Sequence, residues 1–367
     1  MKYYLKEWRD RVFSDPQVLN LALVLCLGAL VIFFLGGMLL PFFIALIVSF
    51  LLDGIVLWLE RFKVPRRAGV MIVFILFVFS IVLMIVGLVP LLTRQVGELV
   101  HTAPAMISSA QQGLEGLPDK YPEHISRDQI DRIFEFFSME FTALGKKVFS
   151  FSIASLKGII TLMVYLILVP LMVFFFLRDK GKILEWVSGF FPKERGLATE
   201  IWQEVNEQIT NYIRGKGYEI LIVWAASYLL FLFLGLDFGI LLSVFVGLSV
   251  LIPYIGAISM FFPVALIAFF QWGMDMQCVY TMIAYIILQM FDGNLLVPLL
   301  LSGVVNLHPV AVIVAILVFG GLWGFWGLLF AIPLATLVQA LLRAWAKRSK
   351  DLSSYKDAKD AKENKED

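Results

Sequence analysis

Residues 293 to 342 read GNLLVPLLLSGVVNLHPVAVIVAILVFGGLWGFWGLLFAIPLATLVQALL. These fifty positions carry no charge, and they are interrupted by glycine, proline, Asn306 and His308. A helix crosses a hydrocarbon layer roughly 30 Å thick with about 20 residues. The stretch is therefore too long for a single crossing and too broken for a simple anchor.

The overall composition places the chain in a lipid bilayer. Of its 367 residues, 60% are hydrophobic and 16% are charged, whereas globular domains carry about 25% charged residues. Lysine plus arginine (30) nearly equals aspartate plus glutamate (29), so the basic excess typical of nucleic-acid binders is missing. The sequence predicts an integral membrane protein without a nucleic-acid partner.

Uncharged runs predict an all-α, polytopic fold. The run from 18 to 52 is broken by Gly36, Gly37 and Pro41, which indicates two antiparallel spans joined by a very short turn. With the runs that follow, the predicted spans lie near residues 17–36, 40–59, 68–93, 149–177 and 220–236.

Two longer runs, 238–274 and 293–342, flank an apolar run at 276–291 and leave the number of spans open. As one helix the first would extend about 55 Å, more than a bilayer requires. If each long run crosses once, the chain has about eight transmembrane segments. If each folds back, it has six spans and two re-entrant helical hairpins.

A polar segment at 94–147 predicts a helical hairpin outside the cytoplasm. Its first part has apolar residues at helical spacing, residues 113–122 supply helix breakers, and a second amphipathic helix follows from Ser126 to Leu144. Basic residues before the first span and after the second, together with Arg343, predict that both termini are cytoplasmic.

Between Arg178 and Lys216 we expect two amphipathic helices at the cytoplasmic face, near 183–191 and 201–213. The chain is thereby divided into a three-span unit, an extracytoplasmic hairpin, a fourth span with cytoplasmic helices, a broken-helix transport region and a disordered charged tail. The corresponding ranges are 1–93, 94–147, 148–219, 220–345 and 346–367.

Signatures of soluble enzymes are missing from the sequence. It contains no Walker A loop, no HExxH and no CxxC, and it has three histidines. Cys26 and Cys278 lie inside apolar runs, where a thiol behaves as a small hydrophobic side chain. We therefore expect no enzymatic activity, no cofactor and no metal site.

Asp292 is the sharpest candidate for a functional side chain. Sixteen uncharged residues precede it and fifty follow, and an ionised carboxylate at membrane depth is costly unless it is paired or hydrated. It either caps a helix at the interface or lines a cavity for a substrate, cation or proton. Asp53, Asp237 and Asp275 stand at the ends of runs, and we expect them at the interface.

Helix breaks form the second class of candidates, because opened backbone is tolerated at depth only beside other protein or a wet cavity. The simpler explanation for any one of them is a kink or close helix packing. The predicted breaks and hinges are Pro253, Gly256, Pro263, Pro298, Pro309, Gly320, Gly324, Gly327 and Pro333.

Several of these segments resemble the autoinducer-2 exporter (AI-2E) family of permeases. They are QITNYIRGK (208–216), VLIPYIGA (250–257), DGNLLVP (292–298), VNLHP (305–309), GGLWGFWG (320–327), AIPLA (331–335) and LVPLMVF (168–174). The resemblance implies a multi-pass permease of the bacterial inner membrane without an ATPase domain and often homo-oligomeric. Some members export a small polar signalling molecule or exchange sodium for protons.

The sequence thus favours a permease or secondary transporter that exports a small solute around broken helices. We expect Asp292 and Asn294 to make polar contacts, His308 to have a gating or proton-linked role, and Asn211 and Arg214 to lie near a cytoplasmic mouth. One alternative is a Na⁺(Li⁺)/H⁺ antiporter that uses Asp292. Another is a membrane scaffold that recruits envelope or division partners.

Overall fold

The computed structural model describes residues 37–114, 156–189, 196–301 and 307–340, with isolated positions at 34, between 128 and 143, and at 343. These residues form helices and turns, with no strand among them. The first predicted span at 17–36 and the charged tail at 346–367 lie outside the described residues. The all-α prediction is confirmed for the part of the chain that the structure covers.

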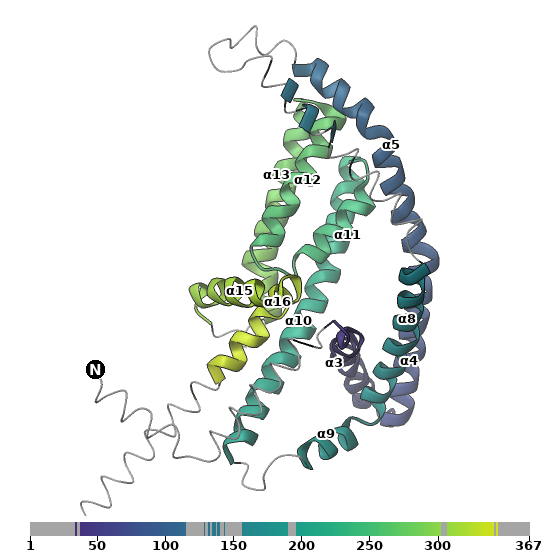
Figure 1. Ribbon diagram of the computed structural model, residues 1–367, viewed down its shortest axis with the longest axis vertical. Coiled ribbons are helices and arrows are strands. Elements are labelled where there is room, and N and C mark those ends of the chain that lie inside the picture. Colours follow the sequence, from purple (N-terminus) through teal and green to yellow (C-terminus); the bar gives the residue numbers. More distant parts are fainter. Residues whose placement is uncertain are drawn as a thin grey trace, which may run out of the picture. The chain divides into compact units, whose positions relative to one another are not determined.

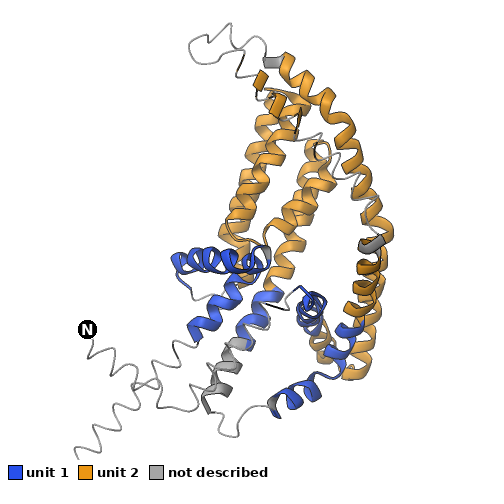
Figure 2. Ribbon diagram, in the orientation of Figure 1, with its two compact units in different colours: residues 1–54, 171–214, 303–367 blue, residues 55–170, 215–302 orange. Residues whose placement is uncertain are grey.

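The chain divides into two compact units (Figure 2). Unit 1 comprises residues 1–54, 171–214 and 303–367, and unit 2 comprises residues 55–170 and 215–302. Helices α3 (Leu40–Arg61), α8 (Leu156–Arg178) and α10 (Gly196–Leu234) each contribute to both units. The five-part division expected from the sequence stays a prediction.

Six described helices are long and apolar enough to cross a membrane, and shorter apolar helices accompany them. This length and composition match a multi-pass membrane protein. The six are Leu40–Arg61, Arg66–Gln112, Ile160–Arg178, Asn206–Leu234, Ile255–Trp272 and Met276–Leu301.

The third span is much longer than predicted. Helix α4 (Arg66–Leu83) continues through a π-helical turn, η1 (Met84–Leu88), into α5 (Val89–Leu114). The sequence changes from apolar to polar near residue 94, but a change in polarity is not a helix break. Its 47 residues from Arg66 to Gln112 alone extend about 70 Å, so the polar end must lie beyond a bilayer roughly 30 Å thick.

Where the structure describes the predicted second helix of the 94–147 hairpin, its residues are helical. Phe134 is buried against Ile107 and Ala110 of α5. The Gln111 Nε2 atom donates a hydrogen bond to Asp131 Oδ1 at 2.9 Å. The two arms therefore contact each other through the apolar stripe and through one polar bond.

Helix α10 corrects a second boundary. The sequence predicted an amphipathic helix at 201–213 followed by a separate span at 220–236, whereas one helix of 39 residues covers both. Gly215, between the two predicted pieces, is a packing residue. A Cβ there would lie 2.5 Å from Leu301 Cδ2 and 2.9 Å from the Leu300 carbonyl oxygen. The preceding amphipathic piece is α9 (Lys180–Gly189), close to the predicted 183–191.

The run 238–274 is broken near its middle, as the sequence predicted, and the choice between one crossing and a re-entrant hairpin stays open. It forms α11 (Gly239–Ser249) and α12 (Ile255–Trp272), separated by a turn at residues 250–254 in which Tyr254 has φ 63°. Helix α11 packs on α12, and α12 packs on α13 (Met276–Phe291) (Figure 1). Helix α12 continues through Pro263, so this proline does not interrupt it.

Residues 292–298 differ from the expected break. Helix α13 continues through a second π-helical turn, η2 (Asp292–Leu296), into α14 (Val297–Leu301), so Pro298 lies within a continuous helical segment. A π turn accommodates one extra residue without opening the helix. At the other end Asp275 caps α13 by accepting a 2.7 Å hydrogen bond from the Met276 amide.

The fifty-residue stretch ends in a tight helical hairpin within unit 1. Helix α15 (Pro309–Trp323) and α16 (Phe325–Leu329) meet at Gly324, whose φ of 59° favours glycine. A Cβ on Gly320 would lie 2.6 Å from Leu328 Cδ2, and a Cβ on Gly327 would collide with the Phe319 carbonyl. Pro333 lies in the next helix, Ala331–Ala340. The glycines therefore allow the turn and the close approach.

Gly256→Ala tests whether the α11–α12 turn requires a residue without a side chain at this position. The added Cβ would collide with the Ser249 carbonyl oxygen, so we expect the free energy of unfolding to fall by about 1–3 kcal/mol. The readout is the thermal unfolding midpoint of the purified protein in detergent. Gly321→Ala in α15 is the control, because its Cβ would meet no atom within 4 Å and should not lower the midpoint. Equal midpoints for the two variants would contradict the packing argument.

Candidate functional site

Three charged side chains are buried together inside unit 2. Lys216 and Glu219 come from α10, and Asp292 comes from the start of η2. Their exposed fractions are 6%, 1% and 8%. Charged residues are almost never buried this deeply unless they are paired. We call these three residues the ionic cluster.

The lysine of the ionic cluster holds two elements together. Lys216 Nζ donates a 2.8 Å hydrogen bond to Glu219 Oε1 and a 2.9 Å hydrogen bond to the Val250 carbonyl oxygen. Val250 directly follows α11, where the last carbonyls of a helix have no partner within that helix. The break in the run 238–274 thus supplies an acceptor that the lysine of α10 satisfies.

The two carboxylates of the cluster are incompletely satisfied. Glu219 Oε2 and Asp292 Oδ1 are buried and have no hydrogen-bond partner among the residues that the structure describes. The charge of Lys216 acts on both carboxylates, and that of Asp292 acts on Glu219. Two acidic groups thus share one lysine within apolar helices, and ionisable groups in such a place are costly and typical of transport pathways.

Asp292 faces the protein interior at the start of the π turn. Asp292 and Leu296 are buried, while Gly293, Asn294 and Leu295 between them are exposed. Asn294 Nδ2 donates a 2.8 Å hydrogen bond to the Met290 carbonyl within its own helix. Asn294, which the sequence placed with Asp292 as a polar contact, therefore does not join the ionic cluster. Single π turns within α-helices are frequent at functional sites.

A polar track continues from Asp292 along α13. Gln289 Nε2 donates to the Tyr285 hydroxyl at 3.0 Å, and that hydroxyl donates to the Ala257 carbonyl at 3.1 Å. Gln289 Oε1 has no partner among the described residues. Because Tyr285, Gln289 and Asp292 share one face of the helix, polar atoms line the interior from the ionic cluster to the first turn of α12.

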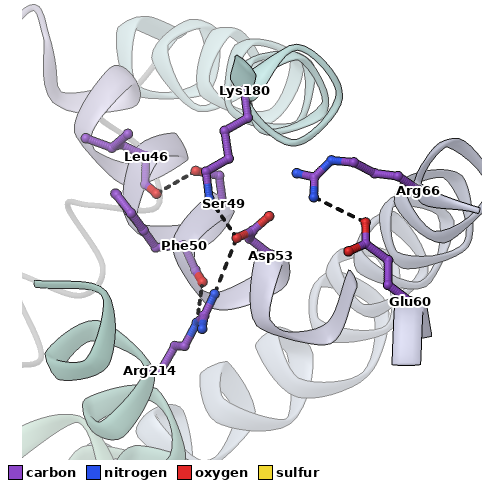
Figure 3. Close-up of polar contacts among 8 residues, drawn as sticks. All are labelled: Leu46, Ser49, Phe50, Asp53, Glu60, Arg66, Lys180 and Arg214. Atoms are coloured by element: carbon purple, nitrogen blue, oxygen red, sulfur yellow. Dashed lines mark hydrogen bonds and ion pairs between the residues drawn. The ribbon is translucent and has the colours of Figure 1, made fainter. Parts of the chain in front are cut away.

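A second ionic group lies in unit 1, and Figure 3 shows Asp53 between Lys180 and Arg214. Asp53 Oδ2 accepts hydrogen bonds from Lys180 Nζ at 3.0 Å and from Arg214 Nη2 at 3.4 Å. Arg214 Nε also donates to the Phe50 carbonyl at 3.1 Å, beside Gly54. Asp53 is 4% exposed because these partners cover it, and its place at the membrane interface stays a prediction. Its role is to join α3, α9 and α10.

Next to this group, at the end of α8, Arg178 forms a surface ion pair with Asp179. The guanidinium donates to Asp179 Oδ2 at 2.8 Å. This hydrogen bond stabilises the charged form and holds the pKa of the Asp179 carboxyl below its usual range. Helix α8 ends at Arg178, close to the predicted end of the fourth span at residue 177.

The remaining predicted site residues are not members of the ionic cluster. His308 is exposed and caps α15, its Nδ1 accepting a 3.3 Å hydrogen bond from the Val310 amide. Pro309 is the first residue of that helix, where a missing amide hydrogen costs nothing. Asn211 is exposed on α10. Arg214 binds Asp53, as described above.

The sequence predictions missed Lys216 and Glu219. Both lie at the edge of an apolar run, where charged residues usually mark the interface, and they were assigned to the boundary between two helices. Their spacing of three residues was the available signal, since it places opposite charges on one helix face. Only the continuity of α10 past Gly215 puts that pair inside the bundle.

Long apolar helices, a broken run and buried, partly unsatisfied carboxylates define a multi-pass helical membrane protein with an ionic site in its interior. The chain belongs to the AI-2E family of transporters, because the model of that family, described as "AI-2E family transporter", matches residues 21–347. The family expected from the sequence motifs is confirmed.

Curated relatives extend this match over nearly the whole chain. The protein is 43% identical to "Putative permease PerM" of Escherichia coli K12 over 341 residues, covering 93% of this chain and 97% of that protein. It is 24% identical to "Putative transport protein YueF" of Bacillus subtilis, covering 89% of this chain and 91% of that one. The names describe permeases and transport proteins, which fits a multi-pass protein of the bacterial inner membrane.

Lys216→Met tests the electrostatic balance of the ionic cluster. Glu219 and Asp292 would stay buried without their cation, and we expect the free energy of unfolding to fall by about 3–5 kcal/mol. Adding Glu219→Gln removes one of the two uncompensated charges and should recover part of the loss. Unfolding midpoints in detergent give the comparison.

The matched control for this variant is Lys182→Met, whose side chain is 85% exposed. Loss of an exposed charge changes stability by at most about 0.5 kcal/mol. If Lys216→Met and Lys182→Met unfold at the same midpoint, Lys216 does not balance the two carboxylates.

Proposed function

We propose that the protein is a secondary transporter that moves a small solute out of the cell through unit 2. The pathway passes the ionic cluster, where α10, the α11–α12 break and η2 meet. The observation that carries this proposal is the pair of buried oxygens, Glu219 Oε2 and Asp292 Oδ1, that have no partner among the described residues.

Unsatisfied acceptors at membrane depth favour a hydrated or solute-filled path over a purely structural role. A structural ion pair would be balanced, and replacing it by apolar side chains would often stabilise a protein. The ionic cluster instead has two carboxylates for one lysine, and its lysine also binds the open end of α11. Such half-helix ends form substrate sites in many secondary transporters.

The proposed mechanism uses Lys216 as an exchangeable partner. In the structure, the Lys216 ammonium donates hydrogen bonds to Glu219 and to the Val250 carbonyl, while Asp292 Oδ1 has no hydrogen-bond partner among the described residues. A polar solute or a proton that neutralises one carboxylate would change which partner the lysine prefers. Because the same lysine holds the α11 end to α10, this exchange would couple occupancy to the packing at the helix break.

The remaining features of the transport cycle follow from the charge pattern and the family resemblance. The basic residues near the chain ends favour cytoplasmic termini, so the 94–147 hairpin would lie outside the cytoplasm. The helix breaks at Pro253 and Gly324 would permit alternating access or gating. Outward transport and assembly into homo-oligomers are what the family resemblance implies.

A Na⁺(Li⁺)/H⁺ antiporter is the second candidate. Asp292 and Glu219 are two buried carboxyl groups near a single lysine, and with both ionised the cluster would carry one net negative charge. One proton or one monovalent cation would neutralise it, and the two would compete for the same oxygens. The same ionic cluster would then carry an ion in place of a solute.

The export proposal is tested by comparing metabolites in the medium of cells that contain or lack the protein. Asp292→Asn keeps the size of the side chain and removes its charge, so we expect the exported metabolites to fall to the level of cells without the protein. Asn294→Ala, two residues away on the exposed face, should retain export. Unchanged export by Asp292→Asn in cells with equal membrane levels of protein would remove the ionic cluster from the pathway.

Proton flux in vesicles tests the antiporter candidate. With purified protein in proteoliposomes that contain a pH-sensitive dye, antiport predicts that external Na⁺ or Li⁺ drives proton movement. The flux should disappear in Asp292→Asn and in Glu219→Gln. A wild-type protein that moves no protons in response to either cation would eliminate this candidate and leave solute export in place.

A further inference from the structure

A pocket of about 810 Å³ opens in unit 2, between α5, the turn from α10 to α11, and the end of α12. Its volume is within the range of about 300–1,000 Å³ that small-molecule sites occupy. None of the residues of the ionic cluster or of the polar track lines it. The pocket is therefore separate from the ionic cluster and from the polar track.

Two glutamine side chains hold the walls of this pocket in place. Gln95 Oε1 of α5 accepts a 2.8 Å hydrogen bond from the Leu241 amide. Gln271 of α12 accepts one from the Asp237 amide at 2.8 Å and donates another to the Gly235 carbonyl at 2.9 Å. The α10–α11 turn is thus bound from both sides, which makes the pocket preorganised for a ligand.

The charge of the lining is negative. Glu98 and Asp237 both line the pocket, and no lysine, arginine or histidine is among its lining residues. Arg94 pairs with Glu98 at 2.8 Å, but it lies outside the lining and its side chain is 76% exposed, so water weakens this pair. Among the described residues, the Asp237 carboxylate has no hydrogen bond or ion pair.

The polar hydroxyl groups of α5 are oriented as acceptors. The Thr102 hydroxyl donates to the Glu98 carbonyl at 2.8 Å, and the Ser109 hydroxyl donates to the Ala105 carbonyl at 2.9 Å. Because each hydroxyl hydrogen is already donated within α5, the hydroxyl oxygens can act only as hydrogen-bond acceptors toward a ligand in the pocket. A ligand that supplies several hydrogen-bond donors fits such a wall.

Aromatic side chains complete the pocket. Tyr228, Phe238 and Phe270 line it together with the aliphatic residues Leu232, Leu236 and Ile240. Aromatic faces attract cations, and they also bury the apolar body of an organic molecule. A bare metal ion would leave these surfaces unused.

We propose that this pocket binds a small organic cation, an ammonium or guanidinium group on an apolar body. Glu98 and Asp237 compensate its charge, the hydroxyl and carboxylate oxygens accept its hydrogen bonds, and the aromatic rings enclose its carbon skeleton. As an assignment of the solute class, this rests on the transport function proposed above. As a binding site, it can be tested without any flux.

Calorimetric titration of the purified, full-length protein in an uncharged detergent tests the site, with n-butylammonium as the probe. Pentanoate and n-butanol carry the same butyl chain with a negative charge or with no charge. We expect saturable binding of butylammonium and at least tenfold weaker binding of the other two. Equal binding of all three would show that only the apolar chain partitions into the protein, which would overturn the proposal.

Two isosteric variants assign the binding to the pocket. Asp237→Asn and Glu98→Gln should each weaken butylammonium binding by at least tenfold, and either one suffices if the other does not fold. Glu207→Gln, an exposed carboxylate of α10 that does not line the pocket, is the matched control and should bind as the wild type does. Unchanged affinity in both pocket variants would refute the assignment.

The outcomes separate this site from the transport proposal. If the protein binds butylammonium but exports nothing, the binding site is supported and the transport proposal is contradicted. If export persists in a protein that does not bind butylammonium, the transport proposal is supported and the pocket is not the site of the transported solute.

Discussion

The hydrogen bond from Lys216 Nζ to the Val250 carbonyl connects the features on which unit 2 depends. In an apolar bundle, a helix that stops within the protein leaves carbonyl oxygens that water cannot satisfy. Helix α11 stops after 11 residues, about 16 Å, which is too short to cross a bilayer. A lysine from a neighbouring helix satisfies its end, and that lysine in turn requires a buried carboxylate.

Glycines make this contact geometrically possible. At Gly247 a Cβ would lie 2.7 Å from Trp224 Cβ, and at Gly215 a Cβ would reach Leu301, so α10 approaches both α11 and α14 more closely than larger residues allow. Small residues serve the same purpose in many membrane helix interfaces, where backbones pack without a hydrophobic driving force. The ionic cluster is thus a consequence of packing density as well as of charge.

The sequence singled out Asp292 because its signal is local, and its role in a pathway stays a prediction. An isolated acid between long uncharged runs must be capped, paired or hydrated, and its burial near Lys216 agrees with that expectation. Asn294 and Pro298 were misjudged because their spacing was read as an opened helix. A π turn shifts the register by one residue and keeps the helix intact, and nothing in the residue types distinguishes it from a break.

Composition and hydropathy alone establish a multi-pass, all-α membrane protein, because apolar length and the absence of charge are properties of the chain and not of its packing. The turn at Pro253 and the glycine-rich hairpin at 320–327 were also visible there, since helix breakers act locally. The partners of Lys216, Glu219 and Asp53 were not. Each ion pair joins side chains whose burial depends on which helices continue and which faces meet, and that is decided only when the tertiary structure forms.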